Sequence, residues 1–86
     1  MGTNYFYLKL VNSSAAPITK LYVNYGLQAQ TLDNITIPND GKTYSIGYYS
    51  AYSNSNARAE NATSYWYWAS LSLANTQNQS ITLTAN

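Results

Sequence analysis

The sequence predicts an all-β fold, a small antiparallel β-sandwich of about six strands that could also close into a barrel-like form. Three observations favour it. Apolar and polar side chains alternate with a period of two in most segments, as in half-buried strands. Turn-forming residues separate these segments at roughly 8–12 residues, the spacing typical of sandwiches and barrels. No segment repeats apolar residues at helical spacing, so residues 1–86 form a single β domain.

The alternation places strands and their inward faces. The predicted strands are residues 5–11, 18–25, 32–37, 43–49, 64–73 and 80–84. The predicted inward side chains of the first four and the last are Phe6, Leu8, Leu10, Leu21, Val23, Tyr25, Ile35, Ile37, Tyr44, Ile46, Tyr48, Ile81 and Leu83. Asp40-Gly41 predicts a tight hairpin turn, because these residues tolerate positive φ. Residues 53–62 are expected to form the one long loop.

Large aromatic side chains are predicted on faces that would normally be polar. In residues 64–73, Leu71 and Leu73 mark the core face and place Tyr65 and Tyr67 on it. The outward aromatic set is then Tyr5, Tyr7, Tyr22, Tyr49, Trp66 and Trp68. Such a set is unusual on a monomer and typical of interfaces. The alternative is that both faces are buried, or that tyrosine serves only as a good strand former.

The composition excludes several classes of function. Only 8% of residues are charged, against about 25% in an ordinary domain, and the formal net charge is +1. The chain has no His and no Cys, which removes the usual acid–base groups, metal ligands and thiol nucleophiles. The carboxylates Asp33, Asp40 and Glu60 are far apart in sequence. We therefore expect no enzyme activity, no catalytic residues, no cofactor and no metal, and the scattered basic residues predict no nucleic-acid partner.

The favoured function is structural self-assembly. A domain of this size has a marginal core, and this one has no disulfide to support it. The predicted edge strands also lack the charged residues that prevent pairing with another chain. We expect a homo-oligomer or polymer, as in a virion, coat or surface filament, that associates through the outward aromatic set. Such a subunit would be extracellular, at a cell surface or in a virion. The N-terminal residues show no signal-peptide pattern.

The alternative function is a carbohydrate- or lipid-headgroup-binding module. Aromatic rings can stack on sugars or sit at a membrane interface, while amide and hydroxyl groups bind polar atoms. The residues expected at such a ligand site are Tyr48, Tyr49, Tyr52, Trp66 and Trp68.

A pattern over roughly residues 5–70 resembles aegerolysin and actinoporin sandwiches. It consists of Val11-Asn12-Ser13, Ile18-Thr19-Lys20-Leu21, Tyr25-Gly26, Ile37-Pro38, the Asp40-Gly41 turn and a Tyr-rich strand. This chain is shorter than either family. The resemblance implies a lectin-like or lipid-headgroup-binding β-sandwich that uses a tyrosine cluster.

Asn-x-Ser/Thr triplets occur at Asn12, Asn34, Asn61 and Asn78, and the composition accounts for most of them. In a cell that glycosylates, we expect Asn12, Asn61 and Asn78 to be usable, because they lie in predicted turns.

Overall fold

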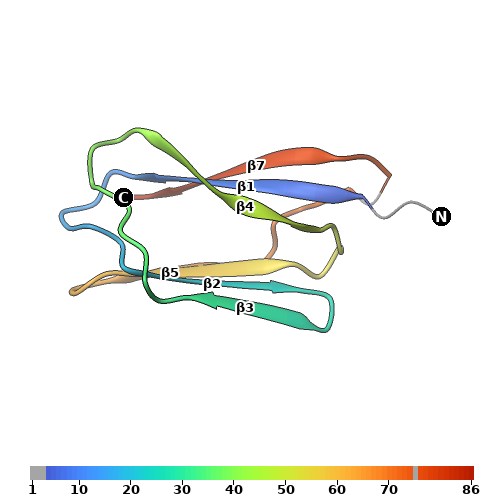
Figure 1. Ribbon diagram of the computed structural model, residues 1–86, viewed down its shortest axis with the longest axis horizontal. Helices are drawn as coiled ribbons and strands as arrows, with labels where there is room; N and C mark the ends of the chain where they lie inside the picture. The colour runs from blue at the N-terminus through green and yellow to red at the C-terminus, as the bar shows by residue number, and fades with distance from the viewer. Residues whose placement is uncertain (1–3, 75) are drawn as a thin grey trace.

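The chain folds into two packed β-sheets, as the computed structural model of residues 4–74 and 76–86 shows (Figure 1). The strands are β1 (Tyr5–Asn12), β2 (Lys20–Tyr25), β3 (Gln28–Leu32), β4 (Thr43–Ser50), β5 (Asn56–Glu60), β6 (Tyr65–Trp68) and β7 (Gln79–Ala85). One sheet has the order β4-β1-β7, and the other has the order β3-β2-β5-β6. The predicted sandwich is confirmed, and the barrel-like alternative is wrong because the two sheets do not join.

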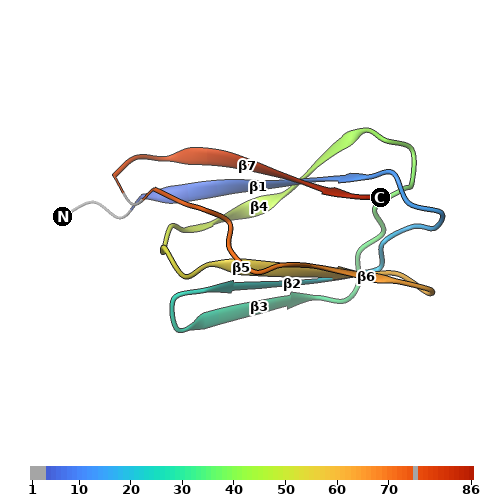
Figure 2. The ribbon, with the colours of Figure 1, turned by 180° about the vertical axis from the view of Figure 1, so that it is seen from behind.

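One strand pair departs from the predicted antiparallel arrangement. β7 pairs with β1 in parallel, from Phe6 opposite Gln79 to Asn12 opposite Ala85. A tight turn cannot join parallel neighbours, and none is needed here because β2 to β6 lie between β1 and β7 in the sequence. Here the chain leaves β6 in the four-stranded sheet and crosses to the other sheet before β7 begins (Figure 2).

The core lies between the sheets and follows the predicted alternation in β1 and β2. Its buried apolar residues are Phe6, Leu8, Leu10, Ile18, Leu21, Val23, Ile37, Tyr49, Ala51, Ala57, Ala59, Leu71, Leu73, Leu83 and Ala85. A fully buried Leu, Val or Phe side chain contributes about 1.5–3 kcal/mol through the water it no longer contacts. The fold therefore rests on the inward faces of β1 and β2, supplemented by buried residues of β4, β5 and β7 and of the segments between strands.

The predicted long loop contains a central strand. β5 pairs with β2 on one side and with β6 on the other, both antiparallel. Its inward residues are only Ala57 and Ala59, so its alternation of alanine with polar residues is a weak strand signal. The small side chains are needed because Trp68 and Trp66 stand beside them in the neighbouring strand. Hydrogen bonding on both sides overrides the low strand propensity.

The predicted strand at residues 32–37 is also displaced. The chain forms β3 at Gln28–Leu32, and beyond it Ile37 makes only an isolated bridge to Ile18. The hairpin between β2 and β3 turns at Gly26 and Leu27. Gly26 has φ +66°, as the first central residue of a type II′ turn requires.

The Asp40-Gly41 turn forms, but it does not close a hairpin. Gly41 has φ +75°, and the main-chain N–H of Lys42 donates to Asp40 Oδ1 at 2.9 Å. The turn leads from Ile37, which forms the isolated bridge to Ile18, to β4 in the three-stranded sheet. The segments on its two sides therefore do not pair with each other. The Tyr44 hydroxyl also donates to the Asp40 carboxylate, and this hydrogen bond lowers the pKa of Asp40.

We expect Gly26→Ala to destabilise the domain more than Gly41→Ala. Both glycines have positive φ, which costs a residue with a side chain about 1–2 kcal/mol. A Cβ on Gly26 would also lie 3.0 Å from the Tyr52 ring, whereas a Cβ on Gly41 would lie 3.8 Å from Ser13 Oγ. Urea unfolding of the two variants measures the difference. Equal losses would show that Tyr52 does not restrict the turn.

Candidate functional site

The outer face of the four-stranded sheet carries a row of side chains that crosses every strand. The strand register places Tyr67 opposite Arg58, Arg58 opposite Tyr22, and Tyr22 opposite Thr31. Neighbouring strands lie about 4.7–4.9 Å apart, so the row is roughly 14–15 Å long. Two aromatic rings, a guanidinium and a hydroxyl are thus displayed in one line.

Polar side chains and a small residue lie beside this row. Asn24 Nδ2 donates to Asn56 Oδ1 at 2.9 Å, so the two amides are tied across β2 and β5. Ala29 stands opposite Asn24 on β3, and its small side chain leaves space at that end of the sheet. On the other side of the row, Glu60 stands opposite both Lys20 and Tyr65.

An open hollow of about 610 Å³ lies on this face of the sheet. Its lining residues are Tyr22, Asn24, Ala29, Gln30, Thr31, Asn56, Arg58, Tyr65 and Tyr67. The volume is within the range of about 300–1,000 Å³ found for small-molecule sites, which combine aromatic walls with a few polar groups. The hollow therefore has the size and chemistry of a ligand site.

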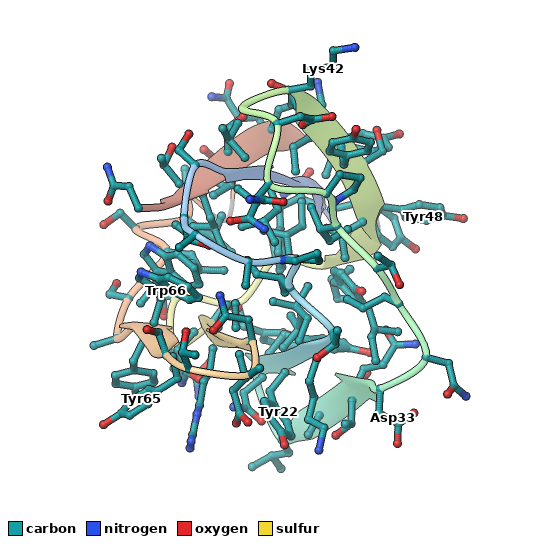
Figure 3. All side chains as sticks on the ribbon, turned by 90° about the vertical axis from the view of Figure 1, so that its left-hand side faces the viewer. Tyr22, Asp33, Lys42, Tyr48, Tyr65 and Trp66 are labelled. Atoms are coloured by element: carbon teal, nitrogen blue, oxygen red, sulfur yellow. The ribbon has the colours of Figure 1, made fainter. Side chains whose placement is uncertain are left out.

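Arg58 lines this hollow and contacts three neighbouring side chains. Its Cζ lies 4.6 Å from the centroid of the Tyr65 ring and 5.8 Å from that of the Tyr22 ring. Its Nη2 lies 3.1 Å from Glu60 Oε2. An exposed ion pair adds little stability, so its main effect is to orient the guanidinium. Figure 3 shows Tyr22 and Tyr65 on the lower sheet, pointing away from the upper one.

A second, smaller aromatic cluster lies on the outer face of the other sheet. The Tyr48 ring is 5.6 Å from the Tyr5 ring and 5.7 Å from the Tyr7 ring, measured between centroids. The adjoining hollow is about 360 Å³ and includes Lys9 and Ser80. The sandwich therefore has an aromatic patch on each of its outer faces.

The residues of the outward aromatic set predicted from the sequence lie in different parts of the molecule. Tyr5 and Tyr7 lie on the outer face of β1, as predicted. Tyr22 also points outward, but from the other sheet. The three residues therefore do not form one continuous surface.

The prediction that Tyr49 faces outward and Tyr48 inward is wrong. Between β1 and β4 the register shifts, with Leu8 opposite Gly47 but Lys9 opposite Ser45. The extra residue, Ile46, is a bulge that reverses the alternation along the rest of β4. Tyr49 is only 7% exposed, and its ring centroid lies 5.6 Å from Phe6 and 5.2 Å from Tyr25. Burial raises the pKa of its hydroxyl.

The prediction that Trp66 and Trp68 face outward is also wrong. Both are half-buried and pack against the core, whereas Tyr65 and Tyr67 are 65% and 59% exposed. The prediction assumed one strand through Leu73, but β6 ends at Trp68. The irregular segment that follows breaks the alternation, so Leu71 and Leu73 say nothing about the face of β6.

The alternative ligand site predicted from the sequence is not assembled. Tyr48 projects from β4 on one side of the molecule and Trp66 lies on the other (Figure 3). Tyr49 is in the core, and Tyr52 lies against Gly26 at a turn. The residues that do come together include Arg58, Asn24 and Asn56, which the sequence reading missed. A possible signal was the alternation in Asn56-Ala57-Arg58-Ala59-Glu60, which places every polar residue on one face.

One predicted glycosylation position is ruled out by burial. Asn12 is fully buried, and its Nδ2 donates to the main-chain oxygens of Ala16 and Ile37, each at 3.0 Å. Its Oδ1 accepts from the N–H of Ser14. Asn61 is half-buried and bonded through its side chain, while Asn34 and Asn78 are exposed.

Residues 4–74 and 76–86 contain no group of three or more His, Cys, Asp or Glu side chains placed to hold a metal ion. Within the same part of the chain, no helix is long and apolar enough to cross a membrane. Comparisons of the chain with protein-family models, with curated proteins and with solved structures find no match. Its function is therefore inferred from the geometry of its faces.

Proposed function

We propose that this domain is a non-catalytic carbohydrate-binding module whose site is the outer face of the four-stranded sheet. The observation that carries the proposal is the row of Tyr67, Arg58, Tyr22 and Thr31 across a hollow of about 610 Å³. The exposed rings offer flat apolar surfaces for the C–H faces of a sugar. The amides of Asn24 and Asn56, with Arg58, offer donors and acceptors for its hydroxyl groups.

The charges on this face favour a neutral sugar. Arg58 is paired with Glu60, and the charged residue opposite Glu60 on β2 is Lys20. These two cations and one carboxylate leave the face with a net charge of only +1. An anionic lipid surface is attracted by a cluster of basic residues, which this face does not present among the described residues. A neutral glycan needs only the stacking and hydrogen-bonding groups that are present.

Self-assembly into a coat or filament is a second proposal, and it requires other contacts than the predicted ones. Tyr49, Trp66 and Trp68 are turned toward the core and are not available to a neighbouring subunit. What supports self-association is the uncharged character of the strand edges, which is developed in the next subsection. Either role would place the domain outside the cell, at its surface or on a virion.

We expect Tyr65→Ala to weaken glycan binding while Tyr48→Ala leaves it unchanged. The two tyrosines are equally exposed, at 65% and 63%, but Tyr48 is on the opposite sheet. Loss of a contacting tyrosine typically costs a binding site about 1–2 kcal/mol, which is roughly a 5- to 30-fold loss of affinity. A glycan array identifies the sugar, and titration calorimetry measures both variants with it.

Two results would contradict the proposal. The first is that the protein retains no neutral glycan on the array. The second is that Tyr48→Ala and Tyr65→Ala weaken binding equally, which would place the sugar elsewhere or show that both variants are misfolded. The circular dichroism spectra of the variants separate these last two explanations.

A further inference from the structure

The edge strands of both sheets contain no charged residues. The sandwich has four edge strands, and their sequences are QAQTL in β3, TYSIGYYS in β4, YWYW in β6 and QSITLTA in β7. None contains a charged residue or proline. Lys9, Lys20, Arg58 and Glu60 are all on the inner strands β1, β2 and β5. Soluble proteins commonly place charges, prolines or bulges at their edges to prevent pairing with another chain.

Three of these edges are limited in other ways. β4 contains the bulge at Ile46, which interrupts its regular hydrogen-bonding edge. β6 has four residues and β3 has five, so each offers a short edge. β7 has seven residues, and its register with β1 is continuous from Gln79 to Ala85. Among the described residues, β7 pairs only with β1, so alternate N–H and C=O groups along its other side are open to another strand.

We propose that the free edge of β7 is an interface with a second copy of this chain. The two β7 strands would pair antiparallel about a two-fold axis at Thr82. The three-stranded sheets of both copies would then form one continuous sheet of order β4-β1-β7-β7-β1-β4. A two-fold contact brings the same surface of each copy together, as is usual in homodimers.

The sequence of β7 suits this arrangement. About an axis at Thr82, Thr82 faces the partner's Thr82 and Ser80 faces the partner's Thr84, so small hydroxyl-bearing side chains meet on the outer face. On the inner face, half-buried Ile81 meets the partner's Leu83. Cross-strand pairs of threonine and of apolar residues stabilise antiparallel strands. A charge at the centre of a two-fold contact would face its own copy, and β7 has none.

The chain has no cysteine, which allows a direct test by single-cysteine variants of the full chain. Opposing Cα atoms in an antiparallel pair are about 4.5–5.5 Å apart, and a disulfide spans about 4.4–6.8 Å. We expect Thr82→Cys to form a covalent dimer under mild oxidation at least about tenfold faster than Thr43→Cys, because the paired thiols have a high effective concentration. Thr43 is the control because it is exposed on β4, at the opposite edge of the same sheet.

Light scattering on a size-exclusion column gives the second measurement. The unmodified protein should have twice the 9.6 kDa mass of the chain. Thr82→Glu should shift it to the monomer, because two carboxylates would then face each other across the axis. This variant should fold normally, since residue 82 is exposed and lies opposite Lys9 of its own chain. Tyr65→Ala should leave the dimer intact, so the interface is tested separately from the glycan site.

Three outcomes would overturn the proposal. The first is a monomer over the whole concentration range. The second is a dimer that Thr82→Glu leaves intact while circular dichroism shows a folded variant. The third is equal cross-linking of Thr82→Cys and Thr43→Cys, because random collisions would then account for both.

Discussion

Replacing Trp66 and Trp68 together by serine is expected to unfold the domain, whereas replacing Tyr65 and Tyr67 together should leave it folded. The four residues alternate within one short strand, so the two double variants change the same element on opposite faces. The tryptophans are half-buried against the core, and Trp66 Nε1 also donates to the main-chain oxygen of Asn86 at 3.1 Å.

The expected size of this effect follows from the burial of the rings. Replacing a buried tryptophan by a small residue costs about 3–5 kcal/mol, so a half-buried one should cost about 2–3 kcal/mol. The two losses are comparable to the total stability of a domain of this size, about 4–13 kcal/mol. The tyrosine pair loses only exposed contacts, including the one between Tyr65 and Arg58, worth about 1 kcal/mol.

Circular dichroism and urea unfolding of both double variants measure the difference. The tyrosine variant should be folded and unable to bind the glycan, and the tryptophan variant should lack cooperative unfolding. A stable, cooperative tryptophan variant would show that the inward face of β6 has been assigned to the wrong residues. Unfolding of the tyrosine variant would instead mean that the outer face of β6 is needed for stability.

Asn12→Ala is expected to destabilise the domain by about 2–4 kcal/mol. The Asn12 amide is buried and joins the end of β1 to the main-chain oxygens of Ala16 and Ile37. Alanine would remove one donor from each oxygen, and each hydrogen bond of this kind contributes about 0.5–1.5 kcal/mol. Ala16 O would keep its bonds from Ser14 Oγ and Asn61 Nδ2, and Ile37 O would keep its bond from the N–H of Ile18. The N–H of Ser14 would also lose its acceptor.

Asn34→Ala is the matched control, because Asn34 is an exposed asparagine in the same kind of triplet. It should change the free energy of unfolding by no more than about 0.5 kcal/mol. Urea unfolding of the two variants tests the comparison. A loss of similar size for both would mean that the hydrogen bonds from Asn12 to Ala16 and Ile37 do not stabilise the fold. The same burial makes a glycan on Asn12 incompatible with the fold.

The sequence alone was sufficient to predict a strand and its buried face where alternating residues differ strongly in polarity. Phe6, Leu8 and Leu10 against Tyr5, Tyr7 and Lys9 leave one way to bury β1, and Leu21 and Val23 do the same for β2. The absence of any helical period and the regular turns then determine an all-β sandwich. These features are local, so they can be recognised without knowing the partners of any strand.

The tertiary structure decided the rest, because those features depend on neighbouring strands. β5 is a strand because β2 and β6 bond it on both sides, and its alanines make room for the tryptophans of β6. The bulge at Ile46 shows only in the pairing of β4 with β1, and it exchanges Tyr48 and Tyr49 between the surface and the core. The row of Tyr67, Arg58, Tyr22 and Thr31 arises from four strands in register. Because all of its members are common strand or surface residues, only the pairing of the strands brings them together.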